Sequence, residues 1–264
     1  MRPALSFLKS RLAEPRTRGL DLDDPRTTEL RRSIIQDKPF LRRIYAEWYS
    51  AILAAVPPGR DRVLELGSGG GFLEQYMPGL IRSDLLPTPN VDLVADGTRL
   101  PIRDASLRAI VMTNVFHHLA EPEAFLTEAA RCIRPAGGLV MIEPWLSTWS
   151  RLVYSRLHHE PCDPEAEEWM VKPGGALSAA NSALPWMVFE RDLPRFRRNF
   201  PLWRVRRIEK LMPMRYLVAG GVSLRTLAPA PSYALWVAAE RLLRPWMDHL
   251  AMFALIVLER TADE

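Results

Sequence analysis

The chain has 264 residues, 48% of them hydrophobic and 25% charged, which is enough for one large domain with a buried core. Its 35 basic and 31 acidic residues leave a formal charge of +4, too balanced to indicate a nucleic-acid scaffold by itself. The two cysteines exclude a disulfide framework and a cysteine metal cluster, and together with the lack of a long apolar run they favour a cytoplasmic protein.

The first 58 residues are expected to form an arm and a helical cap. A helix begins near Thr28, carries apolar residues at helical spacing and breaks near Pro39. A Pro-Pro-Gly run at 57–59 ends this region. We therefore expect the cap to pack on whatever follows it.

From residue 59 onward, short β-rich runs alternate with helical stretches, which is typical of a parallel sheet in an α/β fold. The expected strands cover 63–66, 80–81, 91–95, 109–113, 139–142, 203–212 and 252–258. Helices are expected at 122–133 and 233–249. The stretch 145–190 is irregular and rich in Trp, Pro and acidic residues, so we expect an insertion over one edge of the sheet.

The strongest motif is the run E-L-G-S-G-G-G at 65–71, directly after the first expected strand. Glycines at 67, 69 and 71 allow the backbone to approach a nucleotide-like ligand closely. The G-x-G-x-x-G spacing of dinucleotide sites fails, because Phe72 or Glu74 stands where the last glycine would be. Glu65 would repel a pyrophosphate but attract an ammonium or sulfonium group.

This run and the segments after it resemble the class I S-adenosylmethionine-dependent methyltransferases of the type 11-like group, over about residues 60–145. Asp84 matches the family's acid after strand two, which binds both ribose hydroxyls, and Asp96 matches the acid that contacts the adenine amino group. Asn114 matches the segment near the methionine part of the donor. The resemblance implies that S-adenosyl-L-methionine is bound by Glu65, Gly67, Ser68, Gly69, Gly71, Asp84, Leu85, Asp96, Gly97, Thr98 and Asn114.

The same resemblance implies a Rossmann-like, doubly wound, mostly parallel sheet of seven strands. The domain would cover 59–264 behind the cap at 1–58, with an acceptor lid at 145–190 inserted after strand five. One departure concerns the edge of the sheet. Only eleven residues separate Asp84 from Asp96, less than a helical crossover needs, so one of the two strands there should be very short.

Three residues are candidates for catalysis, each with a structural alternative. His159 belongs to a His-His-Glu run at 158–160, where it could act as a base held by a carboxylate or lie in an exposed polar turn. His117 could be a base or could pack against the donor. Glu143, at the end of the fifth strand, could reach substrate or cap a helix. We expect no metal, since adjacent histidines seldom point the same way.

The resemblance implies transfer of a methyl group. The absence of nucleic-acid signatures and the aromatic, acidic insert favour a small molecule as acceptor, with a hydroxyl of a metabolite or saccharide as its target. One alternative is an RNA methyltransferase using the stretch 191–215, which holds nine basic and two acidic residues. Another is a partner protein that keeps the donor fold without turnover. Packing of the Trp- and Arg-rich stretch 236–246 on the sheet is favoured over contact with a membrane surface. The oligomeric state and the methylated atom stay open.

Overall fold

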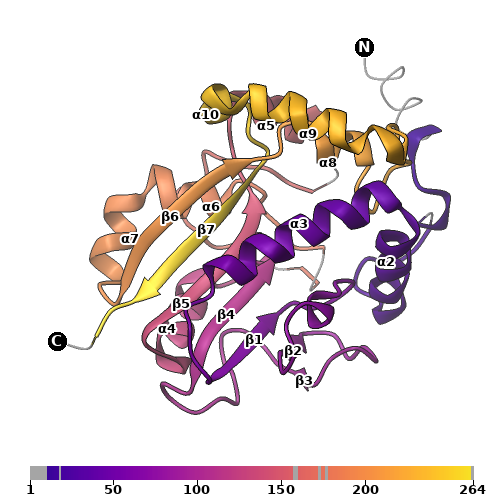
Figure 1. The fold of residues 1–264 in the computed structure, drawn as a ribbon. Helices are drawn as coiled ribbons and strands as arrows, with labels where there is room; N and C mark the ends of the chain where they lie inside the picture. The colour runs from indigo at the N-terminus through magenta and orange to yellow at the C-terminus, as the bar shows by residue number, and fades with distance from the viewer. Residues whose placement is uncertain (1–10, 18, 157–159, 172–173, 176–177, 263–264) are drawn as a thin grey trace.

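The centre of the computed structural model is a seven-stranded sheet, and the structure describes residues 11–17, 19–156, 160–171, 174–175 and 178–262. The strands are β1 (Arg62–Leu66), β2 (Ile81–Asp84), β3 (Leu93–Val94), β4 (Leu107–Thr113), β5 (Ile133–Pro144), β6 (Trp203–Leu211) and β7 (Phe253–Arg260). Their order is β3-β2-β1-β4-β5-β7-β6 (Figure 1). The first five run parallel, whereas β7 is antiparallel to both β5 and β6. This confirms the expected fold class.

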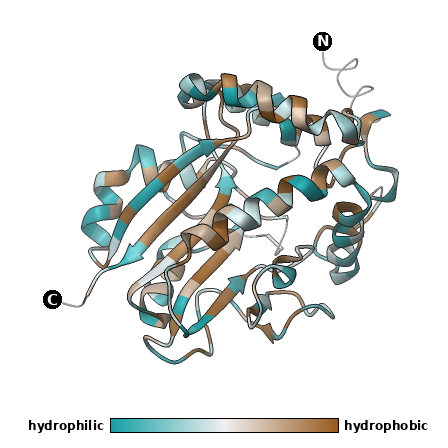
Figure 2. Ribbon diagram, in the orientation of Figure 1, coloured by the Kyte–Doolittle hydropathy of each residue, from teal (hydrophilic) through white to brown (hydrophobic). Residues whose placement is uncertain are grey.

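The central strands carry the core. Residues 109–112 of β4 and 139–142 of β5 are fully buried and almost wholly apolar, as strands covered on both faces must be. Figure 2 shows these strands as the most hydrophobic part of the sheet. Their carboxyl ends all point to one edge of the molecule, where parallel α/β sheets place their ligands.

Two helices precede the sheet, α2 (Pro25–Asp37) and α3 (Pro39–Ala55). Asp24 caps the first, since its side chain accepts a hydrogen bond of 2.8 Å from the Arg26 backbone N–H. The chain becomes extended at Lys38, as the residue before a proline prefers, so the expected break near Pro39 is found. Figure 1 shows α3 lying across the sheet, where the Trp48 ring is centred 5.0 Å from that of Phe253 on β7.

Helix α2 packs directly on the glycine-rich segment after β1. The Arg32 guanidinium donates to the backbone carbonyl of Gly71 and forms an ion pair of 2.6 Å with Glu74. A Cβ atom added at Gly70 would lie 2.9 Å from the Arg32 backbone nitrogen, so the two backbones are in close contact. The cap is therefore attached to the loop that follows the first strand.

The remaining elements connect and cover the strands. They are η1 (Pro15–Thr17), η2 (Leu73–Gln75), η3 (Phe116–His118), α4 (Pro122–Cys132), α5 (Thr148–Arg156), α6 (Leu184–Trp186), η4 (Met187–Arg191), α7 (Leu193–Asn199), α8 (Arg215–Ala219), η5 (Ala230–Ser232), α9 (Tyr233–Leu242), η6 (Arg244–Trp246) and α10 (Met247–Leu250). The rings of Phe116, Phe125, Phe189 and Phe196 join α4 to the segment 187–199. Within the described residues, no helix combines the length and apolar character that crossing a bilayer requires.

One expected helix is interrupted, and the strand at one edge of the sheet is very short. The single helix expected at 233–249 is wrong, because the chain forms α9, η6 and α10 in succession around Pro245, which has no N–H to donate. At the other edge, β3 is only two residues long, and no helix lies between β2 and β3. The Arg82 side chain instead bonds Asp92 at 2.7 Å and closes the short connection.

Candidate functional site

The segment after β1 forms a tight loop at the carboxyl edge of the sheet. Gly67 and Gly69 have φ angles of +69° and +37°, a region that side chains with a Cβ rarely adopt. A Cβ at Gly67 would also overlap the side chain of Val115. The Ser68 N–H bonds the Ser83 carbonyl at 2.9 Å, which ties the loop to β2. Glycine is therefore required here by backbone geometry and by space.

Two acidic side chains stand beside this loop. Asp84 ends β2, and its Oδ2 and Oδ1 accept hydrogen bonds from the backbone N–H groups of Gly69 at 3.0 Å and Leu86 at 2.9 Å. Burial raises the pKa of Asp84 despite these bonds. Asp96 follows β3, is exposed, and accepts from the backbone and hydroxyl of Thr98 at 2.8 and 2.9 Å.

Glu65 is a third acid, buried within β1 with 3% of its surface exposed. Burial raises the pKa of Glu65 to about 7, against a smaller opposing hydrogen bond from Ser68. Its Oε2 atom is buried and has no hydrogen-bond partner within the part of the chain that the structure describes. A buried carboxylate oxygen without a partner is costly, so this atom is suited to a cationic ligand.

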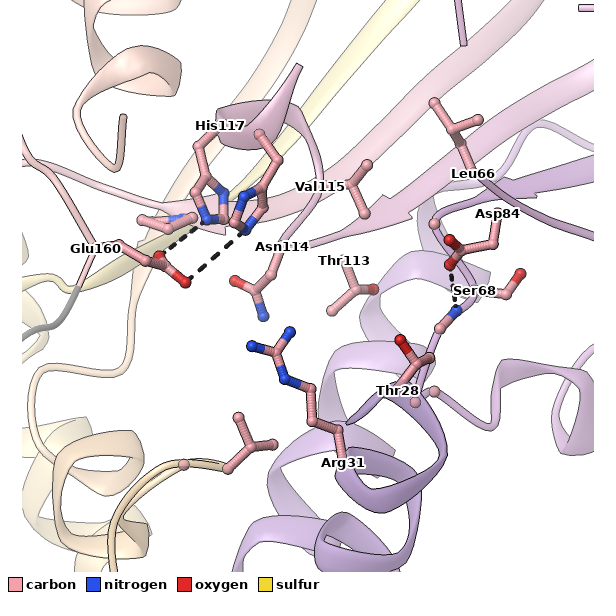
Figure 3. A pocket seen from close by; sticks show the side chains of 18 of the residues that line it. Thr28, Arg31, Leu66, Ser68, Asp84, Thr113, Asn114, Val115, His117 and Glu160 are labelled. Carbon is pink, nitrogen blue, oxygen red and sulfur yellow. Dashed lines mark hydrogen bonds and ion pairs between the residues drawn. The ribbon is translucent and has the colours of Figure 1, made fainter. Parts of the chain in front are cut away.

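All these groups line one cavity of about 600 Å³, which Figure 3 shows from close by. All eleven residues expected to bind the donor contribute to its walls. Thr28 and Arg31 reach it from α2, and Asn114 reaches it from the end of β4, where its φ is +57°. The Tyr45 hydroxyl is bonded to the Asn114 side chain, and burial raises the pKa of Tyr45 to about 12. The cavity has the size of a small-molecule site.

The far end of the cavity holds a histidine–carboxylate cluster. His117 lies in η3, and its Nδ1 is 2.7 Å from Glu143 Oε2, while its Nε2 is 3.3 Å from Glu160 Oε2. Burial alone would lower the pKa of His117, but the hydrogen bonds to the two carboxylates outweigh it and raise the pKa to about 9. His117 is therefore charged at neutral pH, which suits a proton donor better than a base.

Glu143 occupies the end of β5 with no exposed surface. Besides His117, it accepts hydrogen bonds of 2.8 Å from the backbone N–H groups of Val115 and Phe116. It thus caps the turn η3 and holds His117, and it is not part of the cavity lining that the structure describes. The third candidate, His159, lies outside the described residues.

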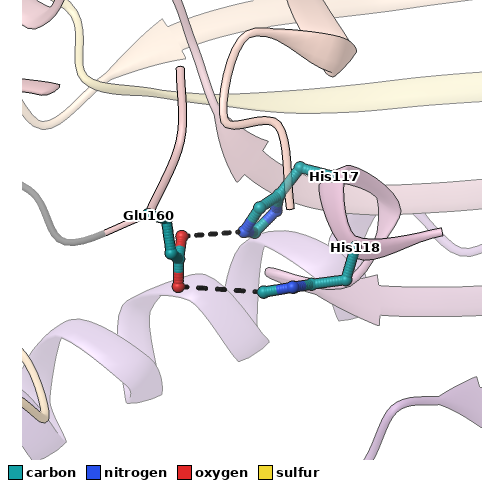
Figure 4. Close-up of side chains that lie close together, drawn as sticks. All are labelled: His117, His118 and Glu160. Carbon is teal, nitrogen blue, oxygen red and sulfur yellow. Dashed lines mark ion pairs between the residues drawn. The ribbon is translucent and has the colours of Figure 1, made fainter. Parts of the chain in front are cut away.

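His118 stands next to His117, with its Nδ1 2.8 Å from the Ala179 carbonyl and its Nε2 3.9 Å from Glu160 Oε1 (Figure 4). Burial, followed by the charge of His117, lowers the pKa of His118 to about 4, so this ring is neutral. A ring nitrogen beside a carbonyl must donate, so Nε2 keeps its lone pair towards the cavity.

Sequence reasoning did not assign Arg31, Tyr45 or Glu160 to the site. Helical periodicity marks Arg31 and Tyr45 only as parts of the cap, and the path of α2 and α3 over the sheet is a tertiary property. Glu160 carried a signal, since it follows the second histidine pair, but its contact is with the first pair, more than 40 residues earlier.

The raised pKa of Glu65 leads to a prediction about stability. The folded state retains the Glu65 proton up to about pH 7, whereas the unfolded chain loses it near 4.5, so the free energy of unfolding should fall between these values. The full loss is about 3 kcal/mol. Glu65→Gln should lack this part of the decline when urea unfolding is measured from pH 4.5 to 8. The exposed Glu209→Gln serves as control, and identical pH profiles for E65Q and wild type would contradict the assignment.

The segment that contains the glycine loop matches a known protein family. Residues 64–141, from β1 to β5, match the family described as "Methyltransferase domain". An uncharacterized 37.1 kDa protein in transposon TN4556 of Streptomyces fradiae is 38% identical over 90 residues. This stretch is 34% of the present chain and 25% of that protein, so the two share a quarter of the relative's length.

Solved structures match over most of the chain. A geranyl diphosphate C-methyltransferase from Streptomyces coelicolor A3(2), crystallised with Mg²⁺, geranyl diphosphate and S-adenosyl-L-homocysteine, has a TM-score of 0.52 at 12% identity, covering 91% of this chain and 87% of that one. A putative methyltransferase from Haloferax volcanii, in complex with the Trm112 methyltransferase activator, has a TM-score of 0.52 at 15% identity, covering 92% and 99%. Identities this low show a shared fold. Together with the match of residues 64–141 to the methyltransferase domain family, they show that this chain resembles the class I S-adenosylmethionine-dependent methyltransferases in its fold and in that segment.

Proposed function

We propose that this protein transfers a methyl group from S-adenosyl-L-methionine to a hydroxyl group of a small molecule, a metabolite or saccharide. The observation that carries the proposal is one continuous cavity, with the glycine loop and its acids at one end, the Arg31 guanidinium between, and His118 and Glu160 at the other end (Figures 3 and 4). A donor and an acceptor could therefore meet within one enclosed space.

The residues at the loop end fit the donor. Gly67 and Gly69 line the cavity at this end, and the Asp84 carboxylate is suited to bind two vicinal hydroxyls of a ribose. Asp96, beside Thr98, would take the adenine amino group. The unpartnered oxygen of Glu65 supports binding of the donor's ammonium group, since a buried carboxylate is stabilised by an adjacent cation.

When bound, S-adenosylmethionine would supply a methyl group activated on a sulfonium. The proton that the acceptor hydroxyl loses would pass to His118 or Glu160, the groups beside it. The protein's part is to hold the acceptor in line and to exclude water. Tyr216 and Phe253 offer apolar surface for the acceptor body, while Arg31 offers a cation. His118 and Glu160 are the polar groups placed to receive its hydroxyl.

Within this proposal, two of the predicted catalytic residues take separate parts. His117 faces the cavity and orients Glu160, so it is a candidate for contact with the acceptor. Glu143 is a positioning residue that acts through His117. The stretch 145–190 supplies Tyr154, Glu160 and Ala179 to the cavity wall, which supports its assignment as an acceptor lid.

The basic stretch 191–215 gives less support to RNA as acceptor. At least six of its nine basic residues have acidic partners: Arg191, Arg195, Arg206, Arg207, Lys210 and Arg215. Arg215 is buried against Glu240. No residue of this stretch is in the wall of the cavity as the structure describes it, so most of its charges are paired within the fold and none lies at the glycine loop. The two cysteines are unpaired, which fits our placement of the protein in the reducing cytoplasm.

Calorimetric titration with S-adenosylmethionine, S-adenosylhomocysteine and NAD tests the donor. We expect micromolar binding of the two sulfur ligands and none of NAD. Release of S-adenosylhomocysteine in the presence of hydroxylated metabolites and glycans, compared with RNA, then tests the acceptor. Binding of NAD alone would refute the donor site, and turnover with RNA only would refute the small-molecule acceptor.

A further inference from the structure

We propose that His117, His118 and Glu160 form a binding site for a divalent transition-metal ion at the acceptor end of the cavity. One ligand atom from each residue lies within 4.8 Å of the other two. The two imidazoles present Nε2 to the same carboxylate, one to each of its oxygens (Figure 4). Two histidines and a carboxylate converging on one point are a recurrent ligand set for such ions.

The ring nitrogens that point away from Glu160, which are the Nδ1 atoms of His117 and His118, already have hydrogen-bond partners. His117 Nδ1 is bonded to the Glu143 carboxylate at 2.7 Å, and His118 Nδ1 to the Ala179 carbonyl at 2.8 Å. A metal-binding histidine characteristically donates its second ring N–H to a carboxylate or a backbone carbonyl, and its Nε2 binds the ion in the deprotonated form, so an ion here would displace the Nε2 proton of His117. Here the carboxylate partner is on His117 and the carbonyl partner is on His118.

A short turn of the backbone brings the two neighbouring histidines together. Both lie in the turn η3, where their ring centroids are 4.1 Å apart and the rings are inclined by 41°. Glu143 fixes the entry to this turn by accepting from the N–H groups of Val115 and Phe116. The two side chains are therefore held together by the fold, and the expectation that adjacent histidines diverge does not apply to this pair.

An ion pair between His117 and Glu160 accounts for their own contact, but it does not account for the approach of His118 to the same carboxylate. A charge-assisted hydrogen bond spans about 2.7–2.9 Å. The separations here are 3.3 Å and 3.9 Å, and the second is too long for a hydrogen bond. Ligand atoms on one tetrahedral ion with bonds of about 2.1 Å are about 3.4 Å apart, close to the 3.3 Å of His117, and the 4.8 Å spread of the cluster would contract around an ion.

The chemistry of the ligands selects the class of ion. Imidazole nitrogens favour Zn²⁺, Fe²⁺ and Co²⁺ over Mg²⁺ and Ca²⁺, which take oxygen ligands. The three protein ligands leave coordination positions directed into the cavity, towards Asn114 and Arg31. That these positions receive the acceptor's oxygen rests on the proposed function. The metal site itself does not depend on the proposed function.

The test uses the full chain after treatment with a chelator, titrated with Co²⁺ and followed by visible absorption, with Zn²⁺ competition and metal analysis. We expect one Co²⁺ per chain with bands typical of nitrogen and oxygen ligands. Glu160→Gln and His118→Ala should each bind at least about tenfold more weakly. His249→Ala, which changes a histidine of α10 outside the cavity lining, should bind as wild type does.

Thermal unfolding shows whether each variant is folded, and S-adenosylhomocysteine binding is measured on the same samples. Equal Co²⁺ binding by wild type and both ligand variants, or no binding by wild type, would refute the metal site while leaving the donor site supported by its own titration. Metal binding without S-adenosylhomocysteine binding would support the metal site and refute the proposed function.

Discussion

Replacing Glu143 with alanine should destabilise the protein by about 3–5 kcal/mol, the cost of breaking a buried ion pair by removing one partner. The substitution leaves the imidazolium of His117 buried without its main counter-charge. It also removes the acceptor of two backbone N–H groups, those of Val115 and Phe116. Urea unfolding monitored by circular dichroism measures the change.

A double-mutant cycle separates the pair from its surroundings. Glu143→Gln keeps one acceptor oxygen and should cost less than alanine does. His117→Gln combined with Glu143→Gln should cost clearly less than the sum of the two single changes, because the uncompensated charge is gone. Additive costs, or a loss below 1 kcal/mol for Glu143→Ala, would show that the two residues are not coupled.

Replacing Asp84 with alanine should weaken binding of S-adenosylhomocysteine by at least about 100-fold. The carboxylate is assigned two hydrogen bonds to ribose hydroxyls, and each such bond to a charged group contributes about 1.5–3 kcal/mol. Asp84→Asn retains one acceptor oxygen and should lose about tenfold. Calorimetric titration of the three proteins at one pH gives the comparison.

Asp92, in the connection between β2 and β3, provides a matched control. Asp92 is also an aspartate next to β2, but it is paired with Arg82 and is absent from the cavity wall as described. Asp92→Asn should bind the ligand as wild type does. Since Asp84 also accepts from the Gly69 and Leu86 backbone, thermal unfolding must show that its variants are folded. Wild-type affinity in a folded Asp84→Ala variant would refute the ribose assignment.

Local sequence patterns, read with the resemblance to methyltransferases, predicted which residues lie at the glycine-loop end of the cavity. Glu65, Asp84 and Asp96 each follow or lie within a short β-rich run, and parallel strands bring such positions to the same edge of the sheet. The positive φ of Gly67 is likewise a local requirement, visible in the sequence as a glycine. The short β3 followed from the spacing between Asp84 and Asp96.

The acceptor end could not be predicted in the same way. The contact between His117 and Glu160 joins residues separated by the whole of α4, β5 and α5. Burial of Glu143 depends on the η3 turn folding back over the end of β5, which no periodicity describes. The sequence marked His117 and Glu143 separately but gave no reason to pair them. The error in the helix at 233–249 has a local cause, Pro245, that its apolar spacing concealed.

The attachment of α2 to the glycine loop affects how quickly ligands can exchange. Arg32 holds the Gly71 carbonyl and Glu74, while Thr28 and Arg31 of the same helix form part of the cavity wall. A ligand that fills the cavity would therefore lie against a helix that is bonded to the glycine loop. We expect association and release to require local opening of α2, at rates below those of free diffusion.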